Sequence, residues 1–293
     1  MEIHLATFYS SDLKRSAKRF EKQAKKMNVY DHIHIFNQED LNDDFKNYIS
    51  VLLKKGKNRG YGHWVWQTYI HQTVLAKMKQ GDIYHWCDVG CHLNINGIHR
   101  LKEYIEIIKN DKNGCLFFSY IKPNLKKKFN NYQFPKNFEF QYTKSDLIKY
   151  FNLKLNDQII QTPQVWGGSF FLRKCKISED LMKEHYEITR NRYDLIDDDE
   201  SKFIEQPLTG FIAHRHSQSV LSILAKKINC NFLSAYESEW ALDEKGERTF
   251  KHLEDYPIIA KRDKKRNLIL RFIDRQKRNY RRRFNKIKNL LNY

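Results

Sequence analysis

The sequence predicts an α/β protein: a mixed, mostly parallel sheet flanked by helices, followed by a basic amphipathic helical tail. Short apolar segments rich in β-branched and aromatic residues alternate with longer segments of helical periodicity. Elements that alternate in this way form βαβ units, whose strands lie parallel. No stretch approaches the roughly 18 uninterrupted apolar residues of a spanning helix, and the first ten residues lack the pattern of a signal peptide. A folded, cytoplasmic protein is expected.

Six strands and six helices are predicted in alternation. The expected strands cover residues 2–8, 31–36, 82–87, 115–120, 165–173 and 231–236. The expected helices cover a segment through residue 26 and then 39–53, 67–79, 97–109, 176–193 and 217–228. Ligands of such sheets bind beyond the carboxyl ends of the strands. Thr7 and Tyr9, at the end of the first strand, are therefore expected to contact a ligand.

Positive charge is concentrated at the end of the chain. The 293 residues contain 53 Lys and Arg against 35 Asp and Glu, a net charge of +18, and residues 261–288 alone carry +12. Apolar residues recur every three or four positions in the same segment. Such a helix suits an anionic membrane surface. A solvated helix that packs on the body and a nucleic-acid-binding helix are the alternatives.

The five cysteines have no CxxC spacing, so neither a disulfide framework nor a zinc knuckle is indicated and reduced thiols are expected. No GxGxxG or GxxxxGK[ST] motif follows a predicted strand, which argues against a dinucleotide dehydrogenase and a P-loop NTPase. The body also lacks the signatures of a zinc finger, an RRM or a helix-turn-helix.

Asp88 directly follows the buried strand predicted over 82–87, and Gly90 stands two residues later. A carboxylate at this position, beside a glycine that lets the backbone approach a ligand, suits a divalent metal that holds a diphosphate. The alternative is an Asp that caps a turn or helix.

Three further segments contain candidate binding residues. Arg59, Gly60, Tyr61 and Trp64 belong to a glycine-rich aromatic loop, in which Arg59 can pair with phosphate and the rings can cover a base or sugar. The alternative for this loop is an aromatic cluster at the start of a core helix. His214 and His216 form a His-x-His pair with metal-ligand spacing, or a helix start with Ser217 as cap. Trp166, Gly167 and Gly168 would let a sugar stack on the ring and approach the backbone; a bulge in a core strand is the alternative.

Together these segments resemble a known family. RGYGHWVWQTYI, GDIYHWCDVGCHLN, WGGSFFLRK and HRHSQSVLSILAKK occur in the order and spacing of bacterial surface-polysaccharide glycosyltransferases with a GT-A type fold. The resemblance covers about residues 3 to 230. It implies a catalytic domain over residues 1–258, and the basic tail would occupy 259–293.

The resemblance implies the roles of several site residues. Asp88 is the counterpart of the acidic residue in the DxD-like metal motif, although Gly90 stands where the second Asp would be. His214 or His216 would complete a divalent metal site, for which manganese is expected. Ser217 replaces an Asp of the family pattern. Asp88, Glu205 and His216 are the candidate catalytic groups, and Glu205, Glu237 or Glu239 could take the place of the missing Asp.

The implied function is transfer of a sugar, with a UDP-hexose favoured as nucleotide-sugar donor. The implied acceptor is a lipid-linked, lipopolysaccharide or capsule glycan, reached from the inner face of the cytoplasmic membrane through residues 261–293. The alternatives are a basic nucleic-acid-binding protein, which the location of the charge in the tail disfavours, and a degenerate relative that binds sugars without turnover.

Overall fold

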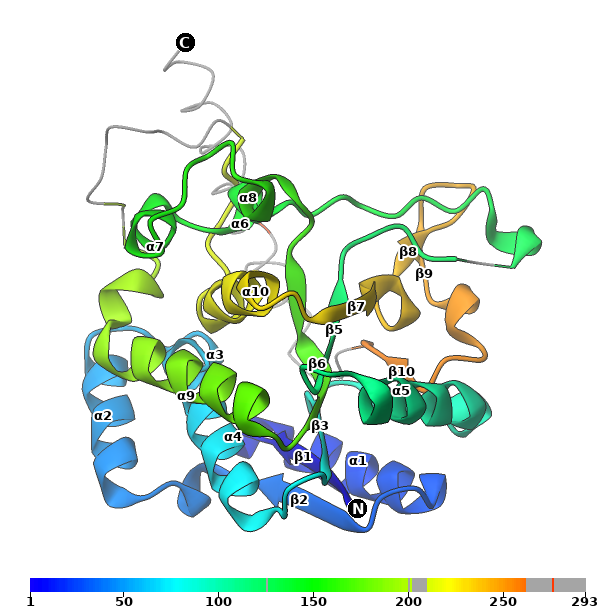
Figure 1. Ribbon diagram of the computed structural model, residues 1–293, viewed down its shortest axis with the longest axis horizontal. Coiled ribbons are helices and arrows are strands. Elements are labelled where there is room, and N and C mark those ends of the chain that lie inside the picture. Colours follow the sequence, from blue (N-terminus) through cyan, green and yellow to red (C-terminus); the bar gives the residue numbers. More distant parts are fainter. Residues whose placement is uncertain (125, 200, 202–209, 262–275, 277–293) are drawn as a thin grey trace.

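The computed structural model describes residues 1–124, 126–199, 201, 210–261 and 276. Its centre is a six-stranded sheet in the order β2-β1-β3-β6-β5-β7 (Figure 1). These strands are β1 (Ile3–Phe8), β2 (His32–Phe36), β3 (Ile83–Cys87), β5 (Cys115–Ser119), β6 (Val165–Arg173) and β7 (Asn231–Ser234). Strand β1 is parallel to β2 and β3, and β5 is parallel to β7, whereas β6 is antiparallel to both β3 and β5. The predicted α/β class with a mixed, mostly parallel sheet is confirmed.

Helices cover both faces of this sheet. The long helices are α1 (Lys14–Met27), α2 (Asp43–Lys54), α4 (Trp66–Lys77), α5 (Ile98–Asn110), α9 (Lys176–Asn191) and α10 (Ser217–Lys227). Short helices are α3 (Gly60–His63), α6 (Glu139–Tyr142), α7 (Ser145–Tyr150) and α8 (Gln158–Gln161). The 3-10 turns are η1 (Ser11–Leu13), η2 (Gln38–Asp40), η3 (Ile95–Gly97), η4 (Lys127–Phe129), η5 (Tyr193–Leu195), η6 (Ala235–Glu237) and η7 (Lys251–Leu253). Two small ribbons pair β4 (His92–Leu93) with β10 (Ile258–Ile259) and β8 (Ala241–Leu242) with β9 (Arg248–Thr249).

Strand side chains alternate between two cores. Tyr84 and Trp86 belong to a buried cluster that includes residues of α4, α9 and α10, while Ile83 and Cys87 belong to a cluster with α1 and α5. Successive residues of a strand point to opposite faces, and a strand covered on both faces is apolar throughout. Figure 1 shows the two helix groups on either side of the strands.

Capping residues explain the one helix start that differs clearly from its prediction. The segment predicted as a helix from residue 39 first forms the turn η2, in which Asn37 Oδ1 accepts the N–H of Glu39 at 2.7 Å. Helix α2 then begins at Asp43, where Asn42 Oδ1 accepts the N–H of Phe45 at 2.9 Å. Two consecutive caps therefore divide one helical pattern into two elements.

The body of the protein continues past residue 258. Strand β10 crosses the predicted boundary between 258 and 259 and pairs with β4, and Ala260 is buried. Residues 262–275 and 277–293, which make up nearly all of the predicted basic tail, lie outside the described residues. Within the described part of the chain, no helix combines the length and the apolar character that crossing a membrane would require.

Candidate functional site

Asp88 lies where β3 ends, at the carboxyl edge of the parallel strands. Its main-chain N–H donates to the carbonyl oxygen of Gly168 at 2.8 Å, and its own carbonyl oxygen accepts the N–H of Cys91 at 2.8 Å. The second bond closes a four-residue turn that contains Gly90. Asp88 is half-buried. The turn therefore fixes the backbone of Asp88 beside the start of β6, because β6 runs against β3 and begins at the edge where β3 ends.

The glycine pair at the start of β6 is surrounded by the other predicted segments. Gln67 Nε2 donates to the carbonyl oxygen of Gly167 at 3.3 Å. A methyl group on Gly167 would lie 3.2 Å from Cγ of Gln218, and one on Gly168 would overlap the indole of Trp166. That indole is 3% exposed and packs in the core, so it offers no free face to a sugar in this conformation.

The aromatic loop has an unusual backbone. Five successive residues have positive φ: Gly60 (60°), Tyr61 (55°), Gly62 (83°), His63 (57°) and Trp64 (63°). Each of the three that are not glycine costs about 1–2 kcal/mol in this conformation. The Trp66 indole N–H donates to the carbonyl oxygen of Gly60 at 2.9 Å and helps to hold the loop. Strained backbone of this kind is concentrated at binding and catalytic sites.

The loop brings His63 to His216 and Asp198. The two imidazole rings stack with centroids 4.2 Å apart. Asp198 Oδ2 lies 3.7 Å from Nε2 of His63, and Asp198 Oδ1 lies 3.6 Å from Nε2 of His216. The three ligand atoms all lie within 4.8 Å of one another. We call these residues the His63 cluster.

Hydrogen bonds fix the second nitrogen of each ring. His216 Nδ1 lies 2.7 Å from the carbonyl oxygen of Ile196, so this nitrogen carries the proton and Nε2 presents a lone pair to Asp198. His63 Nδ1 lies 2.8 Å from the hydroxyl of Tyr193. Histidines that bind metals are oriented in this way by a partner on the other nitrogen.

Both rings of the cluster are neutral at physiological pH. Burial lowers the pKa of His63 to about 4, and the charge of Asp198 opposes this shift only in part. Burial, followed by the neighbouring His63, lowers the pKa of His216 to about 3. Two neutral imidazoles and a carboxylate form a donor set that suits a divalent transition metal.

Arg59 adds a cation to this cluster. Its Nη1 lies 3.3 Å from Nε2 of His216, and its guanidinium lies 5.5 Å from the centroid of the Trp64 ring. A guanidinium suits phosphate oxygens, which it can contact with two N–H groups at once. Tyr61, from the same loop, stacks on Phe8 at the end of β1 with centroids 6.4 Å apart.

His214 has a different environment from His216. Its Nδ1 accepts the main-chain N–H of Lys144 at 3.2 Å, and its Nε2 donates to the carbonyl oxygen of Leu195 at 3.0 Å. The residue is 4% exposed. Both ring nitrogens are thus engaged by the backbone, and the metal site proposed below does not include His214. Ser217 is the first residue of α10, and its carbonyl oxygen accepts from His185 Nε2 at 3.0 Å.

The three glutamates expected as candidate acids or bases, Glu205, Glu237 and Glu239, have different environments. Glu205 lies outside the described residues. Glu237 makes a bidentate ion pair with Arg100, with both N···O distances 2.8 Å. Glu239 is 4% exposed.

The Cys91 thiol is influenced by both Asp88 and Glu239. A hydrogen bond with Cys87 and burial raise the pKa of this thiol, and the negative charges of Asp88 and Glu239 raise it further.

Thr7 and Tyr9 lie on the face of the sheet covered by α1. Thr7 is fully buried, and its hydroxyl has no hydrogen-bond partner among the residues that the structure describes. Tyr9 donates its main-chain N–H to the carbonyl oxygen of Phe36 at 2.9 Å and lines a hollow between α1 and β2. No described contact joins either residue to the His63 cluster.

Sequence reasoning selected His216 and Arg59 but missed His63 and Asp198. The signal for Asp198 is the acidic run Asp197 to Asp199, which follows α9 at a distance of about 135 residues from the loop that it meets. His63 stands inside the quoted loop motif, where its aromatic neighbours favoured a stacking role.

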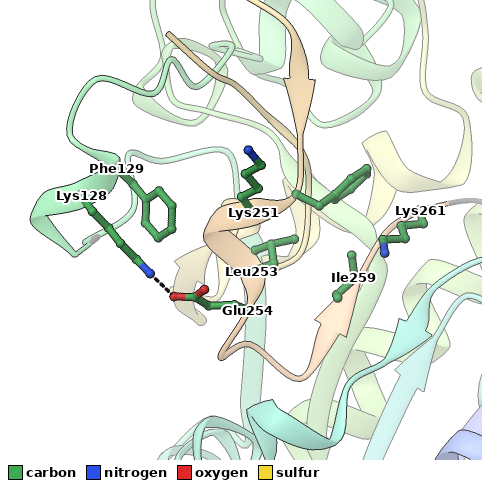
Figure 2. A pocket seen from close by; sticks show the side chains of 8 residues that line it. Lys128, Phe129, Lys251, Leu253, Glu254, Ile259 and Lys261 are labelled. Atoms are coloured by element: carbon green, nitrogen blue, oxygen red, sulfur yellow. Dashed lines mark hydrogen bonds and ion pairs between the residues drawn. The ribbon is translucent and has the colours of Figure 1, made fainter.

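A pocket of about 420 Å³ lies apart from these residues, beside η4, η7 and β10 (Figure 2). Apolar side chains and lysines line it together: Phe129, Phe250, Leu253, Ile259, Lys128, Lys251 and Lys261, with Glu254. Lys128 forms an ion pair with Glu254. Lys261, which lines this pocket, is also the first residue of the segment 261–288 that carries the +12 charge.

No protein-family model and no curated protein sequence matches the chain. The solved structures to which it is similar include glycosyltransferases. One is involved in glycosylation of the major capsid of PBCV-1 (11% identity, 98% of this chain and 100% of that chain, TM-score 0.47). Others are mouse xyloside xylosyltransferase 1 (10%, 82% and 87%, 0.40) and a galactosyltransferase in complex with donor and acceptor sugar analogues (9%, 81% and 75%, 0.37).

Proposed function

We propose that this protein is a glycosyltransferase that uses a nucleotide-sugar donor. The observation that carries the proposal is the convergence of four distant motif segments around the start of β6. Gln67 donates a hydrogen bond to Gly167, Gln218 lies beside the same glycine, and Asp88 donates to Gly168. His216, two residues before Gln218, lies next to Arg59 and His63. Open α/β sheets bind their ligands at this edge.

The chemistry of the leaving group explains the cations. Breaking the bond between a sugar and a diphosphate leaves negative charge on the diphosphate, which positive charge must stabilise. His63, Asp198 and His216 would hold a divalent metal, for which we propose manganese, and the metal when bound would neutralise the phosphates. Arg59, beside His216, would contact the same phosphates directly.

We assign separate roles to the carboxylates. Asp88, at the end of β3, would hold the donor sugar or nucleotide next to the backbone of Gly168. A hydroxyl acceptor must also lose a proton. His216 is a poor base because its pKa is about 3. Among the described residues Glu239 is the better candidate, and Glu205 remains a candidate from the sequence.

The finer assignment concerns donor, acceptor and location. We propose a UDP-hexose donor and an anionic glycolipid acceptor of the lipopolysaccharide or capsule type, bound at the inner face of the cytoplasmic membrane. Two features support an amphiphilic acceptor: the +12 charge of residues 261–288, and the pocket in which lysines surround apolar side chains. The nucleic-acid alternative lacks support in the described body.

A donor-hydrolysis screen tests the activity. UDP-, GDP- and CMP-sugars are incubated with the protein, with and without manganese, and free nucleotide and sugar are measured. We expect manganese-dependent release from one donor class. Binding of a donor without turnover would favour the degenerate sugar-binding alternative, which Ser217 and Gly90 motivate. Absence of both binding and release for every donor would refute the proposal.

A further inference from the structure

A second group of histidines lies at the opposite edge of the sheet, where the parallel strands begin. His4 of β1 and His32 of β2 are register partners, so their side chains point to the same face. Residues two apart in a strand share a face, which adds Glu2 and His34. Asp82, two residues before the β3 partner of His4, extends the group across a third strand.

The side chains of this group converge. Glu2 Oε2 lies 3.3 Å from His32 Nε2, and the rings of His4 and His32 stack with centroids 4.4 Å apart. One ligand atom from each of Glu2, His4 and His32 lies within 4.8 Å of the other two. Asp82 Oδ2 lies 3.7 Å from His4 Nε2. Three donors and a nearby carboxylate thus surround one point.

The ring of His4 is a second, independent observation at this edge of the sheet. The residue is 4% exposed, yet its Nε2 has no hydrogen-bond partner among the described residues. Leaving a buried polar atom without a partner costs about 1–3 kcal/mol. Its Nδ1 lies 3.0 Å from Nε2 of His34. Nε2 of His34 can accept the proton of His4 Nδ1 at this distance, which leaves a lone pair on His4 Nε2.

We propose that Glu2, His4 and His32 form a binding site for a divalent transition metal of the zinc type, separate from the nucleotide-sugar site. Two imidazoles and one carboxylate match the ligands that zinc prefers, whereas magnesium and calcium prefer oxygen alone. His34 orients the ring of His4, as a hydrogen-bond partner of a metal-binding histidine does. Oxygens of Asp82 accept the main-chain N–H groups of Glu2 and Lys79, both at 2.8 Å, which holds the start of β1 in place.

The site would join two strands. Strand β2 is at the edge of the sheet, and β1 is its one partner among the strands that the structure describes. A metal held by His4 and His32 would cross-link β1 to this edge strand. Because a ligand that binds only the folded state stabilises it, zinc should raise the melting temperature of the protein.

Calorimetric titration of the full chain, without a histidine tag, with zinc chloride tests the site. The His63 cluster can also bind zinc, so all titrations use the His63→Gln/His216→Gln background. Adding Glu2→Gln and His32→Gln should remove one equivalent of bound zinc and the rise in melting temperature. Adding His99→Gln, an 88% exposed histidine paired with Glu103, is the matched control and should change neither.

A second readout needs only one of the two substitutions at the proposed site, His32→Gln, and leaves Glu2 in place. In the same His63→Gln/His216→Gln background, cobalt(II) bound by two imidazoles and a carboxylate absorbs in the visible range, and adding His32→Gln alone should abolish that band. His32 is exposed, with a side-chain accessibility of 44%, so this variant should fold. Equal zinc stoichiometry and an unchanged cobalt band in parent and variants would overturn the inference. Donor hydrolysis by His32→Gln in the unsubstituted chain should equal that of the parent, so the two proposals fail separately.

Discussion

The main-chain N–H of Asp88 donates a 2.8 Å hydrogen bond to the carbonyl oxygen of Gly168. This bond continues the antiparallel ladder of β3 and β6 by one step beyond the last paired residues, Cys87 and Ser169. Asp88 therefore has a position set by the sheet and not by a free loop. A backbone fixed in this way limits the positions that the carboxylate can take, which reduces the conformational entropy lost when it binds a ligand.

Asp88→Asn should abolish sugar transfer while the protein remains folded. The substitution removes one negative charge and keeps the size of the side chain. Removing a single preorganised electrostatic group costs about 100-fold or more in turnover. Donor hydrolysis is the measurement, with circular dichroism as the test of folding. Asp43→Asn, at a side chain that is 97% exposed, is the matched control. Parent-like turnover in Asp88→Asn would remove Asp88 from the site.

His216→Gln and His63→Gln should each weaken manganese-dependent binding of a nucleoside diphosphate by about tenfold or more. The pKa of His63 is about 4 and that of His216 is about 3, so both rings stay neutral and the parent's manganese affinity should stay constant from about pH 8 to about pH 6. His214→Gln is the contrasting variant: it should lower stability and leave the manganese effect intact. Titrations of the nucleoside diphosphate with and without EDTA measure the manganese effect, and thermal unfolding measures stability. Identical affinities in the presence and absence of manganese would show that Arg59 and other cations suffice.

Gly60→Ala should disrupt the aromatic loop. A methyl group at Gly60 would overlap the indole of Trp64, at a residue whose φ is 60°. Gly246→Ala is the control, because its φ of 74° imposes the same backbone penalty in open space. Both variants should lose about 1 kcal/mol or more of stability. Only Gly60→Ala should also lose nucleotide binding, and equal binding by the two variants would exclude the loop from the site.

Removing residues 261–293 should abolish binding to anionic vesicles and spare donor hydrolysis. Each cation near an anionic surface contributes about 1 kcal/mol, and the segment carries +12 over residues 261–288. Sedimentation with anionic and neutral vesicles measures the effect. Salt should release the full-length protein, since surface charges are screened within about 8 Å at physiological ionic strength. If the truncated protein is unfolded, the apolar side of the tail packs on the body. If the full-length protein prefers duplex DNA to anionic vesicles, the nucleic-acid alternative is favoured.

Stability should fall as pH falls below about 6.5. Burial lowers the pKa of His85 to about 3, so this histidine stays neutral in the folded protein and takes up a proton on unfolding. The unfolded state then binds more protons, and the free energy of unfolding rises with pH across the window from about 3 to 6.5. From pH 7 to pH 5 this one residue contributes a loss of about 2 kcal/mol. Urea unfolding of His85→Gln at both pH values should show a loss smaller by that amount. An unchanged pH dependence would exclude His85 as the source.

The main elements of the sheet could be predicted because each has a local cause. Strands such as β3 are apolar throughout, and helices such as α10 have continuous helical periodicity, so all six strands and six helices appear close to their expected bounds. The direction of β6 could not be read in the same way. Its composition is that of any buried strand, and only the partners of β6 decide which way it runs.

The candidate site shows the same division. Asp88 and Gly168 could be selected because strand ends and glycines have local signatures. Asp198 could not, because its role depends on two histidines that are distant in sequence. The hydrogen bonds of His214 with the backbone of Lys144 and Leu195 also depend on tertiary structure. The His-x-His spacing in the sequence therefore does not distinguish His214 from His216.

The antiparallel strand β6 also constrains the order in which the chain can fold while it is being made. Strand β3 ends at Cys87, but its second neighbour is not synthesised until residue 173. Until β6 leaves the ribosome, β3 lacks one neighbour and β5 lacks both, because β7 follows β6 in the sequence. Exposed strand edges favour wrong association. The two halves of the sheet can join only through β6, which therefore completes the carboxyl edge as it docks. A nascent chain stalled before residue 165 should consequently have strands, but Asp88 would lack its partner Gly168.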